Sequence, residues 1–349
     1  MKQLRVGYDP ISKDLTHPAD RRRVVFWAKD RGHTIVTNLD ERHDLVLISE
    51  RADIGSWSRK KGGPPKIFDL IDGYLEPRSQ IDDLIRGVGK VITGQLTGTP
   101  KSFKKFTQEL CQAADGVICS TPEQKVGIQK LNSNVHPILD SHDEFPILEP
   151  QSEIRSVPGA RMFWEGLPYT LSGMSVLERA FQGAENEDLP QLSIVTNPTY
   201  PKILGKFFVR NTQDYLDKEF PKLASHASVE KWNLESIHEV ALKSNLGVIP
   251  LDLRSNMNIY KAENRLLIMW RLGLPVLASP TKAYSRVIRS LGTVGLCNTP
   301  EDWARELANF KTHREMFWEQ VKLGQQYLNQ THSKEILLSS WDRAVESVL

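Results

Sequence analysis

Basic and amide side chains follow an apolar run in the second half of the chain. The run at residues 246–251 (LGVIPL) precedes Asn258, Lys261, Asn264 and Arg265, which lie around the expected start of a helix. A diphosphate needs cations and N–H donors, and a helix start that carries basic residues supplies both. The pattern therefore predicts an anion site. The alternative is an exposed basic pair, Lys261 and Arg265, one helical turn apart.

A histidine and an aspartate form a second candidate site near the beginning of the chain. His17 and Asp20 follow the first apolar run, where a helix is expected to start. Imidazole titrates near neutral pH and a carboxylate beside it can orient the ring, so the pair has the composition of a general base. A helix-capping region with a solvent-facing histidine is the alternative interpretation.

Several common catalytic and metal-binding motifs are absent from the sequence. There is no Asp-x-Asp, no GxxxxGK[ST] phosphate loop, no GxGxxG after a strand and no GxSxG elbow. The three cysteines, Cys111, Cys119 and Cys297, have neither CxxC spacing nor a nearby histidine pair. We therefore expect no metal site, and no kinase, dinucleotide dehydrogenase or serine hydrolase.

Net charge and hydropathy limit the kinds of molecule and membrane surface that the protein is expected to contact. The 349 residues include 45 Lys and Arg against 43 Asp and Glu, evenly divided along the chain, so no nucleic-acid partner is expected. No apolar run is long enough to span a bilayer and the N-terminus lacks a signal-peptide stretch, which favours the cytoplasm. Basic clusters at residues 21–23, 59–61 and 101–105 suit peripheral contact with the inner membrane face; solvated helix faces are the alternative.

These candidate residues need a scaffold, and the first half of the chain alternates short apolar runs with amphipathic segments. Such alternation predicts parallel strands joined by crossover helices, in a doubly wound sheet. The expected strands are 4–8, 34–36, 44–49, 66–71, 116–120 and 135–139, and the expected helices are 18–31, 101–113 and one opening at Thr121-Pro122.

A proline-rich polar stretch at residues 140–158 separates this half from a second alternating series. We therefore expect a Rossmann-like domain at 1–150, a second at 151–330 and a helical segment at 331–349. In the second domain the expected strands are 160–164, 192–196, 227–232, 246–251, 275–279 and 293–297, and the expected helices are 170–182, 212–220, 234–243, 260–272 and 282–291.

The stretch at residues 247–279 resembles the donor-binding segment of retaining GT-B glycosyltransferases of the group 1, or family 4, type. The similarity lies in a strand ending in proline, a basic helix start, an apolar helix and then Gly-x-Pro-Val before the next strand. The matching residues are Pro250, Lys261, Asn264, Arg265, Gly273, Pro275, Val276, Ala278 and Ser279. Arg31-Gly32-His33, Ala114–Ile118 with Ser120, and Trp164-Glu165-Gly166 are similar in order and spacing, so the resemblance spans nearly the whole chain.

The resemblance implies two Rossmann-like domains facing an interdomain cleft. The second domain would bind a nucleoside-diphosphate sugar and the first an acceptor beside His17 and Asp20. The C-terminal helix would brace the first domain, and no cofactor or metal would be needed. The donor-side residues that the resemblance adds are Trp164, Glu165 and Gly166 in one turn, Trp232 against the base and Arg210 near the diphosphate. For the two tryptophans core packing is the alternative, and for Arg210 a surface position.

The sequence departs from this family at two glutamates. Alignment on Gly273-Leu274-Pro275-Val276 puts Tyr260 and Ile268 at the two positions, and Glu263 is out of register with both. The leading hypothesis is a metal-independent glycosyltransferase of hexosyltransferase type. Its acceptor would be a hydroxyl of a glycan, lipid or small molecule, in polysaccharide, glycolipid or other glycoconjugate synthesis. A non-catalytic GT-B-like nucleotide-sugar-binding or scaffold protein is the alternative, and a sugar-nucleotide epimerase is ranked last.

Overall fold

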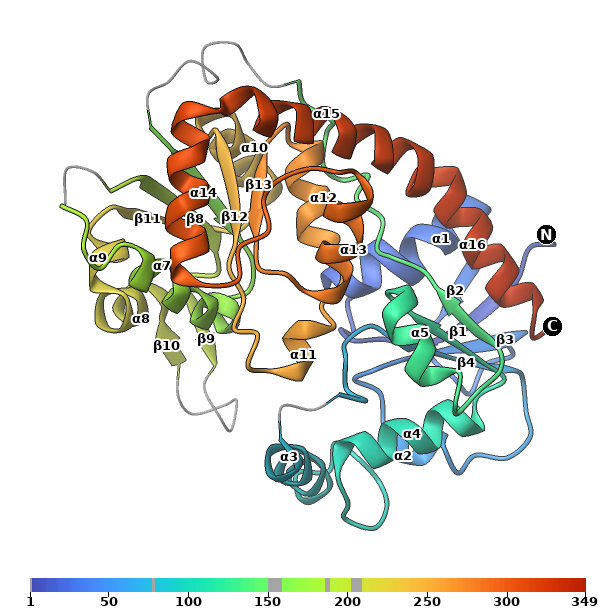
Figure 1. Cartoon of the computed structure of the whole chain (residues 1–349). Helices are drawn as coiled ribbons and strands as arrows, with labels where there is room; N and C mark the ends of the chain where they lie inside the picture. Colours follow the sequence, from blue (N-terminus) through green and yellow to red (C-terminus); the bar gives the residue numbers. More distant parts are fainter. Residues whose placement is uncertain (1, 77–78, 150–158, 186–188, 202–208) are drawn as a thin grey trace. The chain divides into compact units, whose positions relative to one another are not determined.

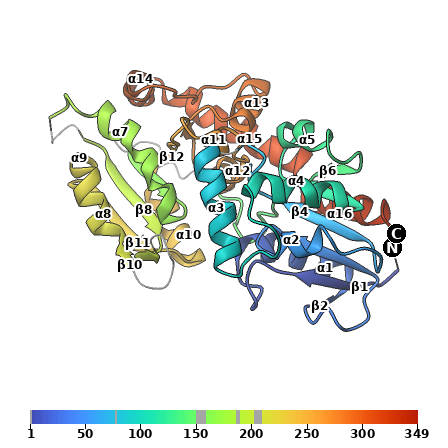
Figure 2. The same cartoon turned by 90° about the horizontal axis from the view of Figure 1, so that it is seen from below.

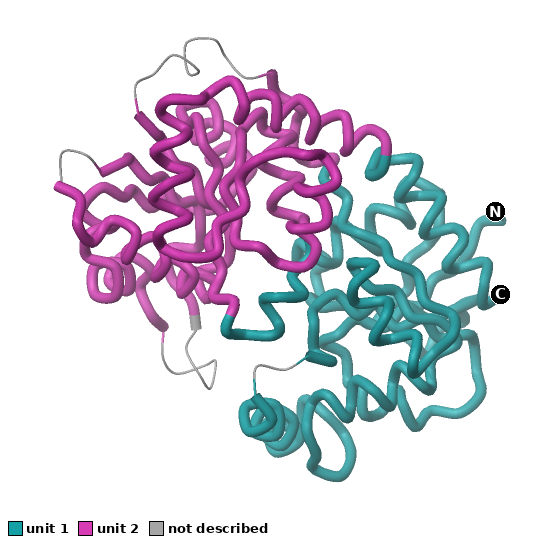
Figure 3. Tube along the Cα trace, viewed as in Figure 1, with its two compact units in different colours: residues 1–142, 254–262, 331–349 teal, residues 143–253, 263–330 magenta. Residues whose placement is uncertain are grey.

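The computed structural model describes residues 2–76, 79–149, 159–185, 189–201 and 209–349 (Figure 1). The chain forms two compact units (Figure 3). Unit 1 comprises residues 1–142, 254–262 and 331–349, and unit 2 comprises residues 143–253 and 263–330. Within the described residues, no helix has the length and apolar character needed to cross a membrane.

Unit 1 is built on a six-stranded parallel sheet in the order β2-β1-β3-β4-β5-β6. Its strands β3, β4 and β5 are buried along their whole length, as expected where helices cover both faces of a parallel sheet. The strands are β1 Arg5–Asp9, β2 Thr34–Val36, β3 Leu45–Ser49, β4 Lys66–Leu70, β5 Gly116–Cys119 and β6 Val135–Pro137.

Two apolar clusters lie in unit 1, and the C-terminal helix contributes to one of them. In that cluster Trp27 of α1 stacks on Trp341 of α16 with ring centroids 5.7 Å apart, and its Nε1 donates to Asp342 at 2.8 Å. The helices of unit 1 are α1 Val25–Arg31, α2 Ile54–Trp57, α3 Gln80–Ile92, α4 Phe103–Ala113, α5 Pro122–Ile128, α11 Asn256–Ile259 and α16 Lys334–Glu346, and a π-helical turn Asp20–Val24 precedes α1.

A buried arginine ties three elements of unit 1 together. Arg23, fully buried in the π-helical turn, donates to both carboxylate oxygens of Asp69 on β4, at 2.9 and 2.5 Å. It also donates to the carbonyl of Ile138 at 2.8 Å and to Asp140 at 3.1 Å. Arg23 belongs to the basic cluster 21–23, so this member of the cluster is not available to a membrane surface.

Unit 2 contains a five-stranded parallel sheet in the order β11-β8-β7-β12-β13 and a separate antiparallel pair, β9 with β10. The strand expected at 293–297 is reduced to a single bridge between Ala278 and Leu296. The strands are β7 Arg161–Glu165, β8 Gln191–Thr196, β9 Thr199–Pro201, β10 Val209–Asn211, β11 Ala227–Lys231, β12 Leu246–Ile249 and β13 Val276–Ala278.

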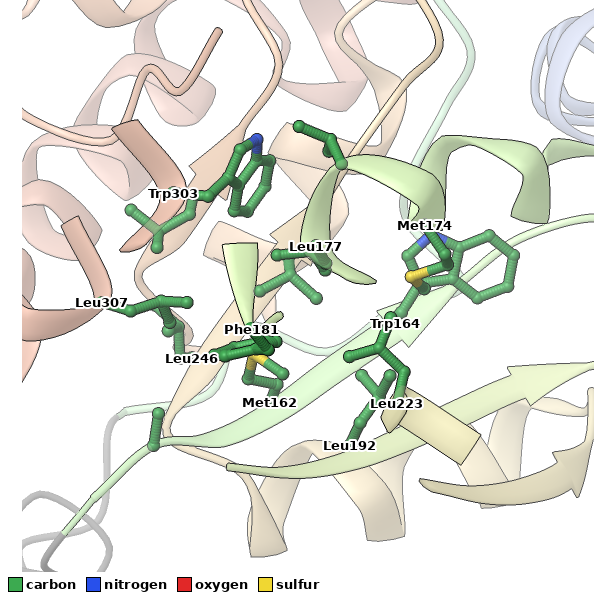
Figure 4. Close-up of a cluster of buried hydrophobic side chains, with 14 of the residues drawn as sticks. Met162, Trp164, Met174, Leu177, Phe181, Leu192, Leu223, Leu246, Trp303 and Leu307 are labelled. Carbon is green, nitrogen blue, oxygen red and sulfur yellow. The ribbon is translucent and has the colours of Figure 1, made fainter. Parts of the chain in front are cut away.

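The helices of unit 2 pack around this sheet, and a large apolar cluster fills one face (Figure 4). The helix expected at 260–272 is shorter than predicted and begins at Asn264; residues 260–262 follow α11 and belong to unit 1. The helices are α7 Ser175–Ala180, α8 Thr212–Glu219, α9 Pro221–Ala224, α10 Leu234–Lys243, α12 Asn264–Arg271, α13 Lys282–Ser290, α14 Pro300–Thr312 and α15 Arg314–Thr331, with a 3-10 segment Pro168–Met174 before α7.

Candidate functional site

Four of the predicted donor-side residues meet at the carboxyl edge of the unit 2 sheet. Glu165 ends β7 and Gly166 follows it; Trp232 follows β11, and Arg265 lies in the first turn of α12. The indole Nε1 of Trp232 donates to Glu165 Oε2 at 3.4 Å, and Arg265 Nη1 donates to the carbonyl oxygen of Glu165 at 3.3 Å. Asn264 is the first residue of α12, so an amide, a guanidinium and a helix N-terminus lie together.

Gly166 makes room for the arginine. Its φ is 155°, and a Cβ built on it would lie 3.1 Å from Arg265 Nη1 and 3.1 Å from the Trp164 ring. The chain turns here because Thr196 Oγ1 donates to the Gly166 carbonyl at 2.7 Å, which links the end of β7 to the end of β8. A side chain at residue 166 would therefore displace the guanidinium.

Trp164 packs in the core of unit 2, which is the alternative that the sequence left open for it, and its place in a donor site stays a prediction. Its side chain is fully buried, and it packs beside Met174 and Leu223 in the apolar cluster (Figure 4). The Arg265 guanidinium lies over the Trp164 ring, 5.6 Å from its centroid. The face of the Trp164 ring therefore attracts the Arg265 guanidinium through a cation–π interaction.

Lys261 and Asn258 lie in a different unit from Arg265. The segment 254–262 belongs to unit 1, where Lys261 Nζ lies 2.6 Å from Asp72 Oδ1. The cations that the sequence placed in one cluster are therefore divided between the two units.

Arg210 lies apart from the contacts of the Glu165 carbonyl. It is in the middle of β10, paired with Tyr200 of β9, and its guanidinium is 5.0 Å from the Tyr215 ring centroid. Its predicted contact with a diphosphate stays a prediction.

Asp20 anchors a loop rather than the histidine. Its Oδ1 accepts from Tyr8 Oη at 2.6 Å and Ile11 N at 2.9 Å, and its Oδ2 accepts from the backbone and the hydroxyl of Ser12, both at 2.9 Å. Asp20 is fully buried, so these bonds fix the loop that follows β1. The predicted bond from Asp20 to the imidazole of His17 is not among the hydrogen bonds of the described residues.

The imidazole of His17 is held by its own loop. Its Nδ1 accepts the backbone N–H of Ala19 at 3.2 Å, which puts the proton of the neutral ring on Nε2. Burial, followed by the positive charge of Arg51, lowers the pKa of His17 below its ordinary value. The ring is therefore neutral at pH 7 with Nε2 as a donor, which suits a hydrogen bond to a substrate oxygen better than removal of a proton through Nε2.

Two acidic residues at the carboxyl edge of the unit 1 sheet were missed by the sequence analysis. Glu50 follows β3 and is 7% exposed; its Oε2 accepts the backbone N–H groups of Ile71 at 3.1 Å and Asp72 at 2.9 Å. Burial and the adjacent charge of Asp72 raise the pKa of Glu50 to about 8. Both residues come directly after a predicted buried strand, at the edge of a parallel sheet where ligands bind, and this position is the signal that could have found them.

The described residues contain no group of three or more His, Cys, Asp or Glu side chains placed to hold a metal ion. The three cysteines, all of them described, are buried and unbonded to one another.

Comparison with known proteins shows the fold. No protein-family model and no curated protein matches the sequence. A glycosyltransferase from Rickettsia africae superposes with TM-score 0.66 at 12% identity, over 99% of each chain. Anabaena Alr3699/HepE, solved with UDP and glucose, gives TM-score 0.65 at 10% identity over 99% of this chain and 100% of its own.

TarM gives TM-score 0.56 at 13% identity over 86% of this chain, which spans 54% of TarM's length. At these identities the likeness shows the fold alone. That fold has two Rossmann-like halves with parallel sheets, and it is the GT-B fold of glycosyltransferases.

Proposed function

We propose that this protein is a glycosyltransferase that moves a sugar from a nucleoside-diphosphate sugar to an acceptor hydroxyl. The observation that carries the proposal is the group of Arg265, Trp232 and Gly166 at the carboxyl edge of the unit 2 sheet. Ligands of open parallel sheets bind at this edge. The GT-B fold supports sugar transfer as the class of reaction, but this support is an analogy between folds and does not come from the site itself.

In this proposal Arg265 and the N-terminus of α12 neutralise the diphosphate as it leaves, when its negative charge grows. Trp232 offers a flat ring for the nucleotide base. Lys261 supplies a second cation, and the Nε2 proton of His17 holds an acceptor or donor oxygen. Neither a metal nor a cofactor takes part. The Anabaena neighbour was solved with UDP and glucose, which makes a uridine nucleotide the first donor to test.

The finer assignments are parts of the same proposal. The transferred group is a hexosyl residue, and the acceptor is a glycan, a lipid or a small molecule in glycoconjugate synthesis. The protein would work in the cytoplasm, with peripheral contact at the inner membrane face through basic residues such as Lys104 and Lys105. Membership of the retaining group 1 type is proposed on the resemblance of residues 247–279.

The test is a thermal-shift panel of UDP-, GDP-, ADP- and TDP-sugars, because a ligand that binds only the folded state raises stability by RT ln(1 + [L]/Kd). We expect one nucleotide to give a selective shift that Arg265→Ala abolishes. Arg289→Ala is the matched control, since Arg289 is exposed in the last turn of α13. Transfer is then assayed with that donor and a set of hydroxyl acceptors.

No shift with any nucleotide at millimolar concentration contradicts the proposal. A shift without transfer or donor hydrolysis favours the alternative, a nucleotide-sugar-binding protein without catalysis. That alternative rests on the residues at the two glutamate positions of the family, Tyr260 and Ile268, neither of which is a carboxylate.

A further inference from the structure

Two carboxylates that have no part in the proposed reaction form a charge cluster with Lys261 in unit 1. We call Glu50, Asp72 and Lys261 the edge cluster. Glu50 and Asp72 follow neighbouring strands, β3 and β4, at the carboxyl edge of the sheet. Lys261 comes from a segment far along the chain that packs into the same unit.

The contacts within the edge cluster are close. Lys261 Nζ lies 2.6 Å from Asp72 Oδ1, and these two side chains are 27% and 29% exposed. Glu50 is more deeply buried and holds the backbone N–H of Asp72. Its second oxygen, Oε1, has no hydrogen-bond partner among the described residues. Asp72 therefore contacts Lys261 directly, whereas Glu50 lies deeper and accepts a hydrogen bond from the backbone of Asp72.

The segment that carries Lys261 makes two further contacts within unit 1. A Cβ on Gly73 would lie 3.2 Å from the Cβ of Tyr260, and Arg86 Nη1 lies 3.9 Å from Met257 Sδ. Lys261 therefore reaches Asp72 from a docked segment, which lowers the entropy cost of the ion pair compared with a free lysine.

The proton on Glu50 sets the total charge of the edge cluster. Burial and Asp72 hold that proton on Glu50 up to about pH 8. Burial opposes the ionisation of Asp72, but Lys261 outweighs it and keeps the pKa of Asp72 below its ordinary value. Near neutral pH Asp72 is therefore charged and Glu50 is neutral, and above pH 8 both are charged. The other charged or titratable groups that face Glu50 and Asp72 are Arg51, Asp69, Tyr74, Arg86 and Lys90.

We propose that Asp72 is a positioning residue that holds Lys261 in place until a diphosphate takes it, and that the charge of Glu50 sets how firmly Lys261 is held. This inference rests on the proposed function, in which Lys261 is a cation of the donor site. A phosphate oxygen and the Asp72 carboxylate compete for the same ammonium group. The ion pair stabilises the lysine in its docked position and weakens the binding of the anion.

The experiment measures the Kd of the UDP-sugar, or of whichever nucleotide sugar gives the thermal shift, by calorimetry from pH 6.5 to 9. A nucleotide sugar is chosen because its phosphates do not titrate in this range, and uridine measured over the same range reports any titration of the base. Wild type is compared with Asp72→Asn, Glu50→Gln, Lys261→Met and the double variant Asp72→Asn/Lys261→Met. Uridine, which carries no phosphate, is measured beside the nucleotide sugar.

We expect Asp72→Asn to bind the nucleotide sugar about fivefold more tightly at pH 7.5, roughly the gain from removing one competing ion pair. Binding of uridine should not change. Lys261→Met should weaken nucleotide-sugar binding and remove the effect of Asp72→Asn. Wild-type affinity should fall about threefold between pH 7 and pH 9 as Glu50 loses its proton, and Glu50→Gln should flatten this dependence.

The two proposals fail in different ways. If wild type binds the nucleotide sugar and Arg265→Ala does not, but Asp72→Asn leaves the Kd unchanged, only the role of Asp72 is overturned. If no variant binds any nucleotide, the proposed function and this inference are both wrong. Should Asp72→Asn fail to fold, the pH dependence of wild type against Glu50→Gln decides the inference: equal slopes overturn it.

Discussion

At the scale of single residues, the buried carboxyl of Glu50 makes a prediction about stability. In the unfolded chain a glutamate ionises near pH 4.5, whereas burial and Asp72 raise the pKa of Glu50 in the folded protein to about 8. The folded state therefore holds the proton between these values. Its contribution to stability is complete below pH 4.5 and is lost as the pH rises to 8.

We therefore expect Glu50→Gln to gain stability relative to wild type as the pH rises. A tenfold change in proton affinity corresponds to about 1.4 kcal/mol, so the advantage should grow by roughly 2–4 kcal/mol between pH 5 and pH 9. Urea denaturation at several pH values measures it. Asp53→Asn is the contrasting control, because hydrogen bonds from Thr97 and Ser56 outweigh burial and lower the pKa of Asp53. A constant difference between Glu50→Gln and wild type would contradict the prediction.

Gly166 gives a second residue-scale prediction. Its missing side chain leaves space for the Arg265 guanidinium, 3.1 Å from where a Cβ would lie. Gly166→Ala should weaken nucleotide binding about tenfold by moving Arg265, with a loss of stability of roughly 1 kcal/mol. Gly183→Ala is the control, since a Cβ there meets nothing within 4 Å. Unchanged affinity in Gly166→Ala would mean that Arg265 is not positioned by this contact.

Part of the candidate site was predicted from the family resemblance, which gave Glu165 and Trp232 as donor-side residues. Both also obey the rule that polar residues at the ends of buried strands lie at the carboxyl edge of a parallel sheet. The same rule applies to Glu50 and Asp72, which the sequence analysis did not use. The role of Asp20 had no such signal, because its partners are a tyrosine hydroxyl and loop amides whose approach depends on the folded loop.

At the scale of elements, Arg23 joins the π-helical turn to β4 and to the residues after β6. Removing it leaves Asp69 and Asp140 without their cation, and Asp69 is fully enclosed in the unit. Breaking such a pair costs about 3–5 kcal/mol because a charge stays buried without compensation. We expect this loss for Arg23→Met in urea denaturation. Lys243→Met, which removes an exposed pair with Glu239, should cost less than about 0.5 kcal/mol.

Helix α3 shows why an element can escape prediction. It contains Gly87 and Gly89, which lower helix propensity, and it exposes apolar residues instead of burying them. The exposed ones are Ile81, Leu84, Ile85 and Ile92. Asp83 instead anchors α3 by accepting the N–H of Lys104 in α4 at 3.0 Å, and the two helices pack side by side (Figure 2). The apolar residues of α3 still recur at helical spacing, at positions 81, 84, 85, 88 and 92, so the sequence held a signal for this helix that the prediction did not use.

The two glycines of α3 make a matched pair of tests. A Cβ on Gly87 would lie 2.0 Å from the carbonyl oxygen of Lys101, so Gly87→Ala must push the backbone apart and should cost roughly 1–3 kcal/mol. A Cβ on Gly89 meets nothing within 4 Å, so Gly89→Ala should stabilise the protein by about 0.5–1 kcal/mol through helix propensity. Thermal melts compare the two. Equal effects would mean that Gly87 is not needed for the approach of α3 to residues 101–104.

At the scale of the whole molecule, alternation of apolar runs and amphipathic segments predicted two parallel sheets, because each strand needs a crossover helix to return to the same edge. It could not predict that residues 254–262 pack with unit 1, since that depends on contacts such as Lys261 with Asp72 that have no local pattern. The strand expected at 293–297 failed for a similar reason. A strand is defined by its partner, and only Leu296 bridges to Ala278.

Because the C-terminal residues 331–349 belong to unit 1, a substitution that disrupts the packing of α16 should lower the stability of unit 1. Trp341 is buried and stacks on Trp27, so Trp341→Ala should cost about 3–5 kcal/mol. Calorimetry measures the consequence, since units with separate cores can unfold in separate transitions. We expect Trp341→Ala to lower the transition of unit 1 alone, and a bound nucleotide to raise the transition of unit 2 through Arg265 and Trp232, with any effect on unit 1 passing through Lys261. If Trp341→Ala and the nucleotide act on the same single transition, the two units unfold together and their cores are energetically coupled.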